Sequence, residues 1–265
     1  MRLFIELSYD GSPFHGWQRQ PESISVQQEI ETQLTQFLGV RVPVMGCGRT
    51  DTGVHASYFV AHCDWPTDTE RAKRYSDWEE AAWKLNGMLP PEIAIHRMVP
   101  VHPKAHARFD AIERGYIYRM HQRKDPFLLS QSARIYRKTD FDRMQAACTY
   151  LIRKGDFASF CKLGSDQGTT ICDVREARMT KINEYEWQFE IRADRFLRNM
   201  VRAIVGTLLD VGQGRREPEE MKAILASGLR SEAGKSAPAN GLFLSQVTYP
   251  ESIWSSAEPS VKGSN

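Results

Sequence analysis

Hydrophobic and polar residues alternate in several short segments of the chain, beginning at its first residues. Leu3, Ile5, Leu7 and Tyr9 occupy every second position, which is typical of a strand with one buried face. Similar segments predict further strands at residues 58–65, 116–119, 177–181 and 186–192, and a final strand that reaches Tyr249. Strands are therefore expected from the start of the chain to its last part.

Apolar residues at helical spacing predict helices between these strands. The first helix follows a capping box formed by Ser25 and Gln28, carries an apolar stripe, and ends at Gly39. Other helices are predicted to begin after Asp77, after Thr139, at Arg195 and at Pro218, and the last of them ends at Gly228. Because strands at both ends of the chain enclose these helices, the order predicts an α+β fold.

The helix predicted for residues 195–211 has two different faces. Its apolar face holds Leu197, Met200, Val201, Ile204, Leu208 and Val211. At 100° per residue, Arg195, Arg198 and Arg202 fall on the other face together with Gly206. A face with three arginines and no acid favours contact with an anion over simple exposure to water.

The composition is that of an ordinary soluble globular protein, with 41% hydrophobic and 26% charged residues in a chain of 265. The net charge of +2 does not by itself indicate a nucleic-acid partner. The charges are unevenly distributed, however. Residues 102–124 hold six Lys or Arg against two acids, and residues 192–202 hold four Arg against one Asp. Such patches can guide an RNA backbone, although charged runs are also typical of a solvated surface.

The cysteine spacing and the first ten residues indicate in which cellular compartment the protein is found. The five cysteines form no CxxC pair and no His/Cys ligand set, which indicates reduced thiols and no structural zinc. The first ten residues alternate as a strand, unlike a signal peptide, and no apolar run is long enough for a membrane span. A cytoplasmic protein is therefore expected. His55 and His62 lack metal-like partners in the sequence and are predicted to be structural.

A glycine-rich stretch at residues 46–56 differs from the other connections. Its glycines do not suit the interior of a helix or strand, and it carries one cation, Arg49, and one carboxylate, Asp51. Apolar runs before and after it predict a loop at the end of a sheet, where reactive groups are often held. An Asx turn, in which Asp51 bonds its own backbone, is the simpler alternative.

The segment Gly48-Arg49-Thr50-Asp51-Thr52-Gly53-Val54-His55-Ala56 resembles the signature of the tRNA pseudouridine(38-40) synthases, the TruA family of pseudouridine synthases. The family usually has Ala at the position of Thr52. Further segments resemble family motifs in the same order along the chain: Phe14 to Gln20, His106 to Arg119, Phe196 to Gly206 and Ala237 to Leu244. The resemblance thus covers residues 1–250.

The resemblance implies an enzyme that isomerises uridine to pseudouridine in the anticodon stem-loop of tRNA, at positions 38–40. It assigns the nucleophile to Asp51, the charge partner of this nucleophile to Arg202, and assistance in base flipping to Arg49. It implies that Tyr116 packs on the target uracil, and that other residues contact the tRNA: Trp17, His106, Arg108, Phe109 and Arg198. For Trp17, composition alone supports a place at the edge of the core equally well. It implies no cofactor and no metal. The expected partners are the anticodon arm of tRNA and a second copy of the chain in a homodimer.

The resemblance also implies the pseudouridine-synthase fold, in which two similar α/β halves share an extended, mostly antiparallel sheet with a central catalytic cleft. The halves are expected at residues 1–110, which include the Asp51 loop, and 111–250, followed by a flexible tail at 251–265. Bacterial relatives often carry Arg where this chain has Gly115, so one phosphate contact is expected to be missing. The polar loop at 162–170 is either an RNA-contacting lid or a disordered connection.

Two other functions would use some of the same residues. A non-catalytic RNA-binding or chaperone protein would use the basic faces but would not need Asp51, because a carboxylate repels phosphate. A hydrolase or phosphotransferase with an Asp nucleophile would need clustered acids for Mg²⁺, and none accompany Asp51. The isomerase is therefore the leading hypothesis.

Overall fold

The computed structural model describes residues 1–162, 164 and 168–254, and the chain forms two compact units. One unit holds Met1–Ile112 and the chain from Val247 onward, and the other holds Glu113–Gln246. Residues 247–250, which were expected in the second half, therefore belong to the first unit. The predicted loop at 162–170 lies partly outside the described residues.

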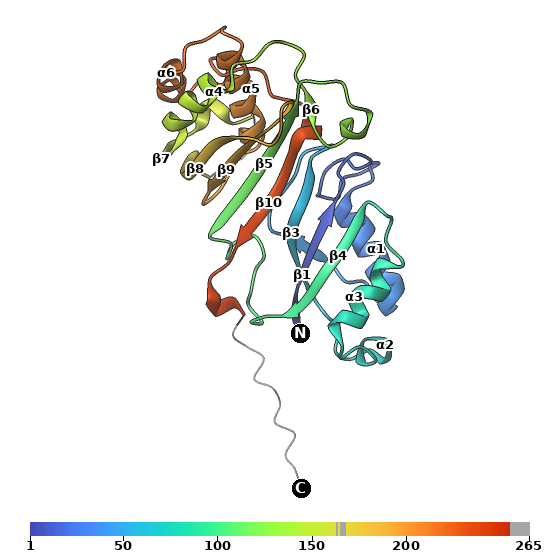
Figure 1. Ribbon diagram of the computed structural model, residues 1–265. Helices are drawn as coiled ribbons and strands as arrows, with labels where there is room; N and C mark the ends of the chain where they lie inside the picture. Colours follow the sequence, from blue (N-terminus) through green and yellow to red (C-terminus); the bar gives the residue numbers. More distant parts are fainter. Residues whose placement is uncertain (163, 165–167, 255–265) are drawn as a thin grey trace. The chain divides into compact units, whose positions relative to one another are not determined.

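The first unit is built on an antiparallel sheet. In it, β1 (Arg2–Tyr9) lies between β4 (Ile93–Pro100) and β3 (His55–Asp64), and the short β2 (Val44–Gly46) pairs with β3. Beside these strands Figure 1 shows the helices of this unit, which are α1 (Val26–Leu38), α2 (Glu70–Lys73) and α3 (Trp78–Asn86).

Side-chain and glycine caps set the ends of these helices. Ser25 accepts a hydrogen bond from the backbone amide of Gln28 at 3.3 Å, and Gly39 closes α1 with a left-handed φ of 74°. Asp77 caps α3 by accepting hydrogen bonds from backbone amides of the first turn. The predicted starts of both helices are confirmed.

Strand β1 buries its predicted apolar face and one residue of the other face, Phe4. Phe4, which points away from the predicted apolar set, is fully buried because its ring packs against Tyr249 at 5.0 Å and Trp254 at 5.7 Å. The short turn Glu251–Ile253 also carries a buried residue, Ile253. The start of the predicted flexible tail is thus packed, and residues 255–265 of that tail lie outside the described part of the chain.

The second unit carries a sheet in the order β10-β5-β9-β8-β7. Its strands are β5 (Glu113–His121), β7 (Arg153–Asp156), β8 (Ile171–Lys181), β9 (Glu186–Ala193) and β10 (Leu242–Thr248), of which the last two residues belong to the first unit. A two-residue β6 (Ala133–Arg134) runs parallel to the end of β5. The pairs β5–β9, β9–β8 and β8–β7 are antiparallel. Three helices, α4 (Phe141–Cys148), α5 (Met200–Gly212) and α6 (Glu220–Ser227), lie together in this unit (Figure 1). Both units therefore have the expected mixed α/β architecture with mostly antiparallel sheet.

Helix α5 begins at Met200, and the predicted start at Arg195 is wrong. Strand β9 runs to Ala193, and Asn199 has a left-handed φ of 65°, which Asn tolerates better than most residues. Arg195 and Arg198 consequently lie in the connection before the helix. The predicted arginine face does not exist, because apolar spacing continues through this connection and does not reveal the left-handed residue.

Two other helix ends in this unit also differ in detail from the sequence pattern. Helix α4 is capped by Asp140, which accepts from the amide of Asp142 at 3.0 Å, and the predicted cap Thr139 is bonded to the carbonyl of Arg137 instead. Helix α6 begins at Glu220, so its predicted start at Pro218 is wrong, whereas it ends as predicted at Gly228, whose φ is 65°.

Gly206 allows the segment 233–237 to approach α5 closely. A Cβ at Gly206 would lie 1.7 Å from the carbonyl oxygen of Lys235. The next residue, Thr207, accepts a hydrogen bond from the amide of Gly234 at 2.8 Å. Gly206 therefore serves backbone packing, and its predicted place in an anion-facing wall is wrong.

No helix among the described residues is long and apolar enough to cross a membrane. The five cysteines, all of them described, are free thiols as predicted. Burial raises the pKa of the Cys63 thiol to about 12, so this residue is a buried apolar group in practice.

His62 is buried in the first unit and holds a neighbouring turn. Its Nδ1 accepts a hydrogen bond from the amide of Ala107 at 3.0 Å, and its ring centre lies 4.6 Å from that of His106. Burial lowers the pKa of His62 to about 4, and the nearby Arg2 and His106 lower it further. The predicted structural role is confirmed, with His62 neutral at physiological pH.

Replacing Gly206 with Ala is expected to destabilise the protein, because the new methyl group meets a backbone carbonyl that cannot rotate away. Overpacking typically costs about 1–3 kcal/mol of unfolding free energy. Gly87→Ala is the control, since its Cβ would lie an ordinary 3.4 Å from the carbonyl of Lys84. Urea unfolding measures both variants, and equal midpoints would contradict the close approach at Gly206.

His62 is expected to make stability fall as the pH is lowered from about 6.5 to about 4. Its pKa is about 4 in the folded protein and near 6.5 when unfolded, so the unfolded chain binds the extra proton in this window. Asp64 and Asp110 favour the protonated form but do not outweigh burial. The loss attributable to His62 is of the order of 3 kcal/mol.

The measurement compares urea unfolding of the wild type and His62→Asn at several pH values. Asn keeps an acceptor near the position of Nδ1 and does not titrate. The variant should lose less stability than the wild type between neutral and acidic pH. Parallel pH profiles for the two proteins would show that His62 is not held neutral by its surroundings.

Candidate functional site

The Asp51 loop, residues 47–54, joins β2 to β3 and is held by contacts with strand β1 and the segment 11–17. Its first amide, that of Cys47, extends the β2–β3 pairing by donating to the carbonyl of Val60 at 2.8 Å. The hydroxyl groups of Tyr9 and Thr50 are 2.8 Å apart, and the amide of Trp17 donates to the Thr50 carbonyl at 3.3 Å. These contacts fix the backbone directly before Asp51.

Gly16 makes this support possible. Its φ is 88°, and a Cβ at this position would lie 2.3 Å from the carbonyl oxygen of Thr50. Gly16 lies in the segment Phe14 to Gln20, which resembles a family motif. The Gly16 backbone packs directly beneath the loop.

Asp51 is half-buried and Arg49 is exposed, so the two charged side chains of the loop have different surroundings. The carbonyl of Asp51 accepts from the amide of Val54 at 3.1 Å, which closes a turn. In an Asx turn the amide of Gly53 would bond the Asp51 carboxylate, but it donates to the carbonyl of Phe14 at 3.3 Å. The 11–17 segment therefore supports the loop, and the acceptor of the Gly53 amide is the Phe14 carbonyl.

Trp17 does not offer a ring face to a nucleobase. Its side chain is only 3% exposed, and its ring stacks on Phe59 with centres 4.1 Å apart. A Cβ on Gly46 would lie 2.5 Å from the indole, so the ring is enclosed from that side as well. The predicted tRNA contact of Trp17 is replaced by a role in the core beneath the Asp51 loop.

The turn 106–110 in the first unit presents aromatic and cationic side chains to solvent. The rings of His106 and Phe109 stack with centres 4.2 Å apart, and Phe109 is 73% exposed. Nδ1 of His106 accepts hydrogen bonds from the amides of Arg108 and Phe109, and Asp110 accepts from the amide of His106 at 2.7 Å. Burial, Arg2 and Arg108 lower the pKa of His106, whereas Asp110 raises it, with a net lowering. The sequence-predicted group His106, Arg108 and Phe109 therefore forms one ordered, exposed turn.

Tyr116 and Tyr118 lie on one face of β5 as predicted, but their surroundings differ. Tyr116 is half-buried and meets Phe196 edge-on with ring centres 5.0 Å apart. Tyr118 is fully buried and donates to the carbonyl of Pro238 at 2.9 Å. Gly115 directly precedes Tyr116 on β5. A Cβ added at Gly115 would lie 3.1 Å from the Cβ of Gln246, so this position is crowded. Of the two phenols, Tyr116 is the one that a ligand can reach.

Arg202 is half-buried on α5, and its position is fixed by Ala237. Its Nε donates to the carbonyl of Ala237 at 2.7 Å, and its own carbonyl accepts from the amide of Ala237 at 2.9 Å. Arg198 is exposed in the connection before α5. Its carbonyl accepts from the amide of Lys162 at 3.0 Å. The two arginines therefore differ in exposure and in how firmly they are held.

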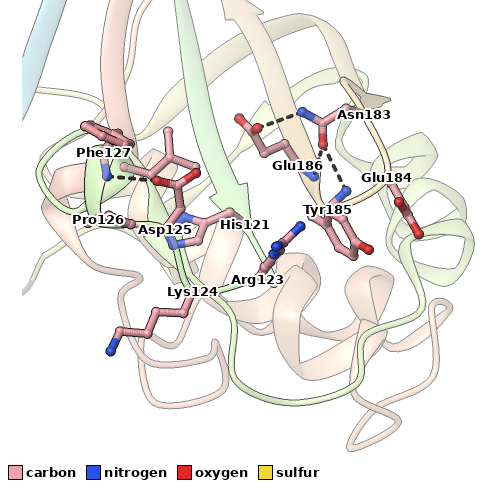
Figure 2. Close-up of a pocket in the computed structure, with 11 residues that line it drawn as sticks. His121, Arg123, Lys124, Asp125, Pro126, Phe127, Asn183, Glu184, Tyr185 and Glu186 are labelled. Atoms are coloured by element: carbon pink, nitrogen blue, oxygen red, sulfur yellow. Dashed lines mark hydrogen bonds between the residues drawn. The ribbon is translucent and has the colours of Figure 1, made fainter.

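A pocket of about 590 Å³ lies at the far end of β5 from Tyr116 (Figure 2). It is lined by the end of β5, the following loop and the turn between β8 and β9, and its charged residues carry both signs: Arg123, Lys124, Asp125, Glu184 and Glu186. Asp125 is engaged by the amide of Phe127 at 2.8 Å, and Asn183 donates to Glu186 at 2.7 Å. None of the residues that the sequence predicted for the site lines this pocket.

No group of three or more His, Cys, Asp or Glu in the described part of the chain is arranged to hold a metal ion. The structure gives a positioning role to residues for which the sequence indicated only membership of a family-like segment. Ala237 and its neighbours position Arg202, and Gly16 positions Thr50. Their contribution is through backbone atoms, which carry no side-chain signature.

Comparison with known proteins gives consistent matches along the chain. Residues 147–250 match the model of a family described as tRNA pseudouridine synthase. A tRNA pseudouridine synthase A of Porphyromonas gingivalis is 46% identical over 254 residues, which are 96% of this chain and 99% of that protein. The protein of the same name from Bacteroides thetaiotaomicron is 47% identical over 256 residues, 96% of this chain and 93% of that protein.

A third relative, from Bacteroides fragilis and also named tRNA pseudouridine synthase A, is 46% identical over 253 residues, 96% of this chain and 98% of that protein. Identity at this level over nearly the full length of both chains reaches across both compact units. The chain therefore belongs to the tRNA pseudouridine synthase family.

Proposed function

We propose that this protein isomerises uridine to pseudouridine in the anticodon stem-loop of tRNA, at positions 38–40. The observation that carries the proposal is the half-buried Asp51 on a braced loop, in a chain 46% identical over 96% of its length to a tRNA pseudouridine synthase A. The family membership does not favour the alternative of a non-catalytic RNA-binding protein.

The reaction explains why a carboxylate is needed. The bond between N1 of uracil and C1′ of ribose breaks, the base turns, and a bond from C5 to C1′ forms. C5 loses its proton and N1 gains one, so the product is an isomer of the substrate. Asp51 acts as the nucleophile that forms a covalent bond with the nucleoside during this exchange. The chemistry requires no redox step, so we propose that it proceeds without a cofactor or metal.

Arg49 is proposed to assist base flipping. A base in a stem must leave the stack before an enzyme can act on it, at a cost of a few kcal/mol. The exposed Arg49 side chain lies two residues from Asp51 and can enter the space that the base leaves. Its exposure and its place on the same loop support this role.

Arg202 and Tyr116 are proposed to complete the site from the second half, in a cleft between two similar α/β halves. Arg202 pairs with Asp51, and Tyr116 packs on the target uracil. The bond from Nε of Arg202 to Ala237 supports this role, because it fixes the plane of the guanidinium and so prepares it for a carboxylate.

Other residues are proposed to hold the tRNA. The exposed stack of Phe109 on His106 suits a nucleobase, and Arg108 and Arg198 suit phosphate groups because both are exposed cations. We also propose that the protein works in the cytoplasm as a homodimer, with one tRNA lying across both subunits.

Asp51→Asn tests the nucleophile directly. The substitution preserves size and removes the carboxylate, so pseudouridine formation should fall by about three orders of magnitude or more. Binding of tRNA should persist, because Asp51 contributes no attraction for phosphate. Mass spectrometry of the tRNA measures the product. Turnover by the purified variant at a rate near that of the wild type would contradict a covalent role for Asp51.

Arg202→Met should lower turnover far more than tRNA affinity. Removing the fully buried partner of a carboxylate costs about 3–5 kcal/mol. Because Arg202 is only half-buried, we expect a loss of about 2 kcal/mol, or roughly thirtyfold in rate. Arg198→Met is the matched control, since an exposed phosphate contact should weaken binding and leave turnover at saturating tRNA unchanged.

Single-turnover rates and dissociation constants for the two variants separate these effects. If Arg202→Met weakens binding and leaves the bound rate intact, as expected for Arg198→Met, then Arg202 is a phosphate contact and does not pair with Asp51. Arg202→Lys should recover only part of the rate, because Lys keeps the charge but not the planar group.

A further inference from the structure

The segment 233–237 is bound to the start of α5 through three separate groups. Asn199 donates from its side-chain amide to the hydroxyl of Ser236 at 2.6 Å. Arg202 forms two hydrogen bonds with Ala237, one through its carbonyl and one through its Nε. The segment therefore positions Arg202, the residue of α5 that is proposed for the site.

Arg230 organises the same segment from its other side. One of its terminal nitrogens, Nη1, donates to the carbonyls of Ala233 at 3.3 Å and Gly234 at 3.0 Å. The other, Nη2, donates to the hydroxyl of Ser236 at 3.0 Å. A single guanidinium thus ties three residues of the segment together, as a planar group with several donors can.

The hydroxyl of Ser236 connects Arg230 with the start of α5. It accepts from Arg230 on one side and from Asn199 on the other. The next residue, Ala237, holds the Nε of Arg202. The path from Arg230 to the guanidinium of Arg202 therefore consists of two hydrogen bonds joined by the peptide link between Ser236 and Ala237.

The rest of the segment cannot readily adjust if Arg230 is lost. It lies against α5 at Gly206, where a Cβ would be 1.7 Å from the carbonyl of Lys235, and a Cβ on Gly234 would be 2.7 Å from the carboxylate of Asp210. Gly234 is also held by the hydroxyl of Thr207 at 2.8 Å. With this packing, a change at Arg230 is transmitted toward Ser236 and Ala237.

We infer that Arg230 is a positioning residue for Arg202: it shapes the 233–237 segment so that the Ala237 carbonyl holds the Arg202 guanidinium in one orientation. The catalytic consequence rests on the proposed role of Arg202, whereas the positioning itself does not. In this role Arg230 acts through its hydrogen bonds to the 233–237 segment and not through attraction of phosphate.

The test uses Arg230→Met, Arg230→Lys and Ser236→Ala in the full-length protein. Arg216→Met is the matched control, because Arg216 donates to the carbonyl of Glu232 at 2.8 Å, just outside the segment. Hydrogen exchange of the Arg202 Nε–H, followed by NMR and assigned with Arg202→Lys, reports the bond to Ala237 without any need for activity.

In Arg230→Met the Arg202 Nε–H should exchange about tenfold faster or more, the effect of weakening one hydrogen bond. Single turnover should slow by a similar factor while tRNA affinity stays near the wild-type value. Ser236→Ala should change both in the same direction, Arg230→Lys should recover part of each, and Arg216→Met should change neither. Ser236→Ala keeps the test valid if Arg230→Met does not fold.

Unchanged Nε–H exchange in Arg230→Met and Ser236→Ala would overturn the inference, whatever happens to activity. It would also be overturned if Arg230→Met weakens tRNA binding and Arg230→Lys restores it fully, since that pattern indicates a phosphate contact. If the wild type makes no pseudouridine, the proposed function fails, and faster exchange in the variants would still establish Arg230 as the residue that positions Arg202.

Discussion

Close approach of two backbone segments underlies both parts of the proposed site. At Gly16 the 11–17 segment reaches the carbonyl of Thr50, directly before Asp51. At Gly206 the 233–237 segment reaches α5, one turn after Arg202. In each place a side chain would separate the segments, and the residue that carries the chemistry would lose its support.

This constraint favours backbone support over side-chain support for the reactive groups. The Thr50 carbonyl is held by the backbone amide of Trp17, and Arg202 is held by both polar backbone groups of Ala237. Backbone groups have fewer alternative positions than long side chains, so they hold an orientation at a lower cost in conformational entropy. The arrangement suits a reaction in which one carboxylate must meet one carbon atom of a flipped nucleoside.

The sequence predicts those features that local spacing determines. The caps at Ser25, Asp77 and Gly228 act within a few residues, and their helix ends lie where the pattern places them. The glycine-rich loop around Asp51 is likewise evident from composition. Helix α5 is different, because apolar residues continue at helical spacing through a connection that contains the left-handed Asn199. The predicted arginine face followed from that uninterrupted spacing.

Long-range contacts explain the remaining differences. Trp17 stands among polar residues in the sequence, as a base-stacking residue would, yet Phe59 and Tyr9 from two strands enclose it. Phe4 looks like the exposed side of a strand until the chain returns after residue 247 to cover it. Arg230 has no local motif at all, because its partners are backbone carbonyls and one hydroxyl. Such partners are defined only when the chain has folded.

Formation of pseudouridine exchanges the bond from ribose to uracil N1 for a bond to C5, and the hydrogen on C5 reports this exchange. The purified protein is incubated, in the presence of a chelator, with tRNA carrying tritium at C5 of its uridines. Because C5 must lose its hydrogen to join C1′, tritium should be released to water in proportion to the pseudouridine formed. A folded protein that binds the tRNA and releases no tritium would contradict it.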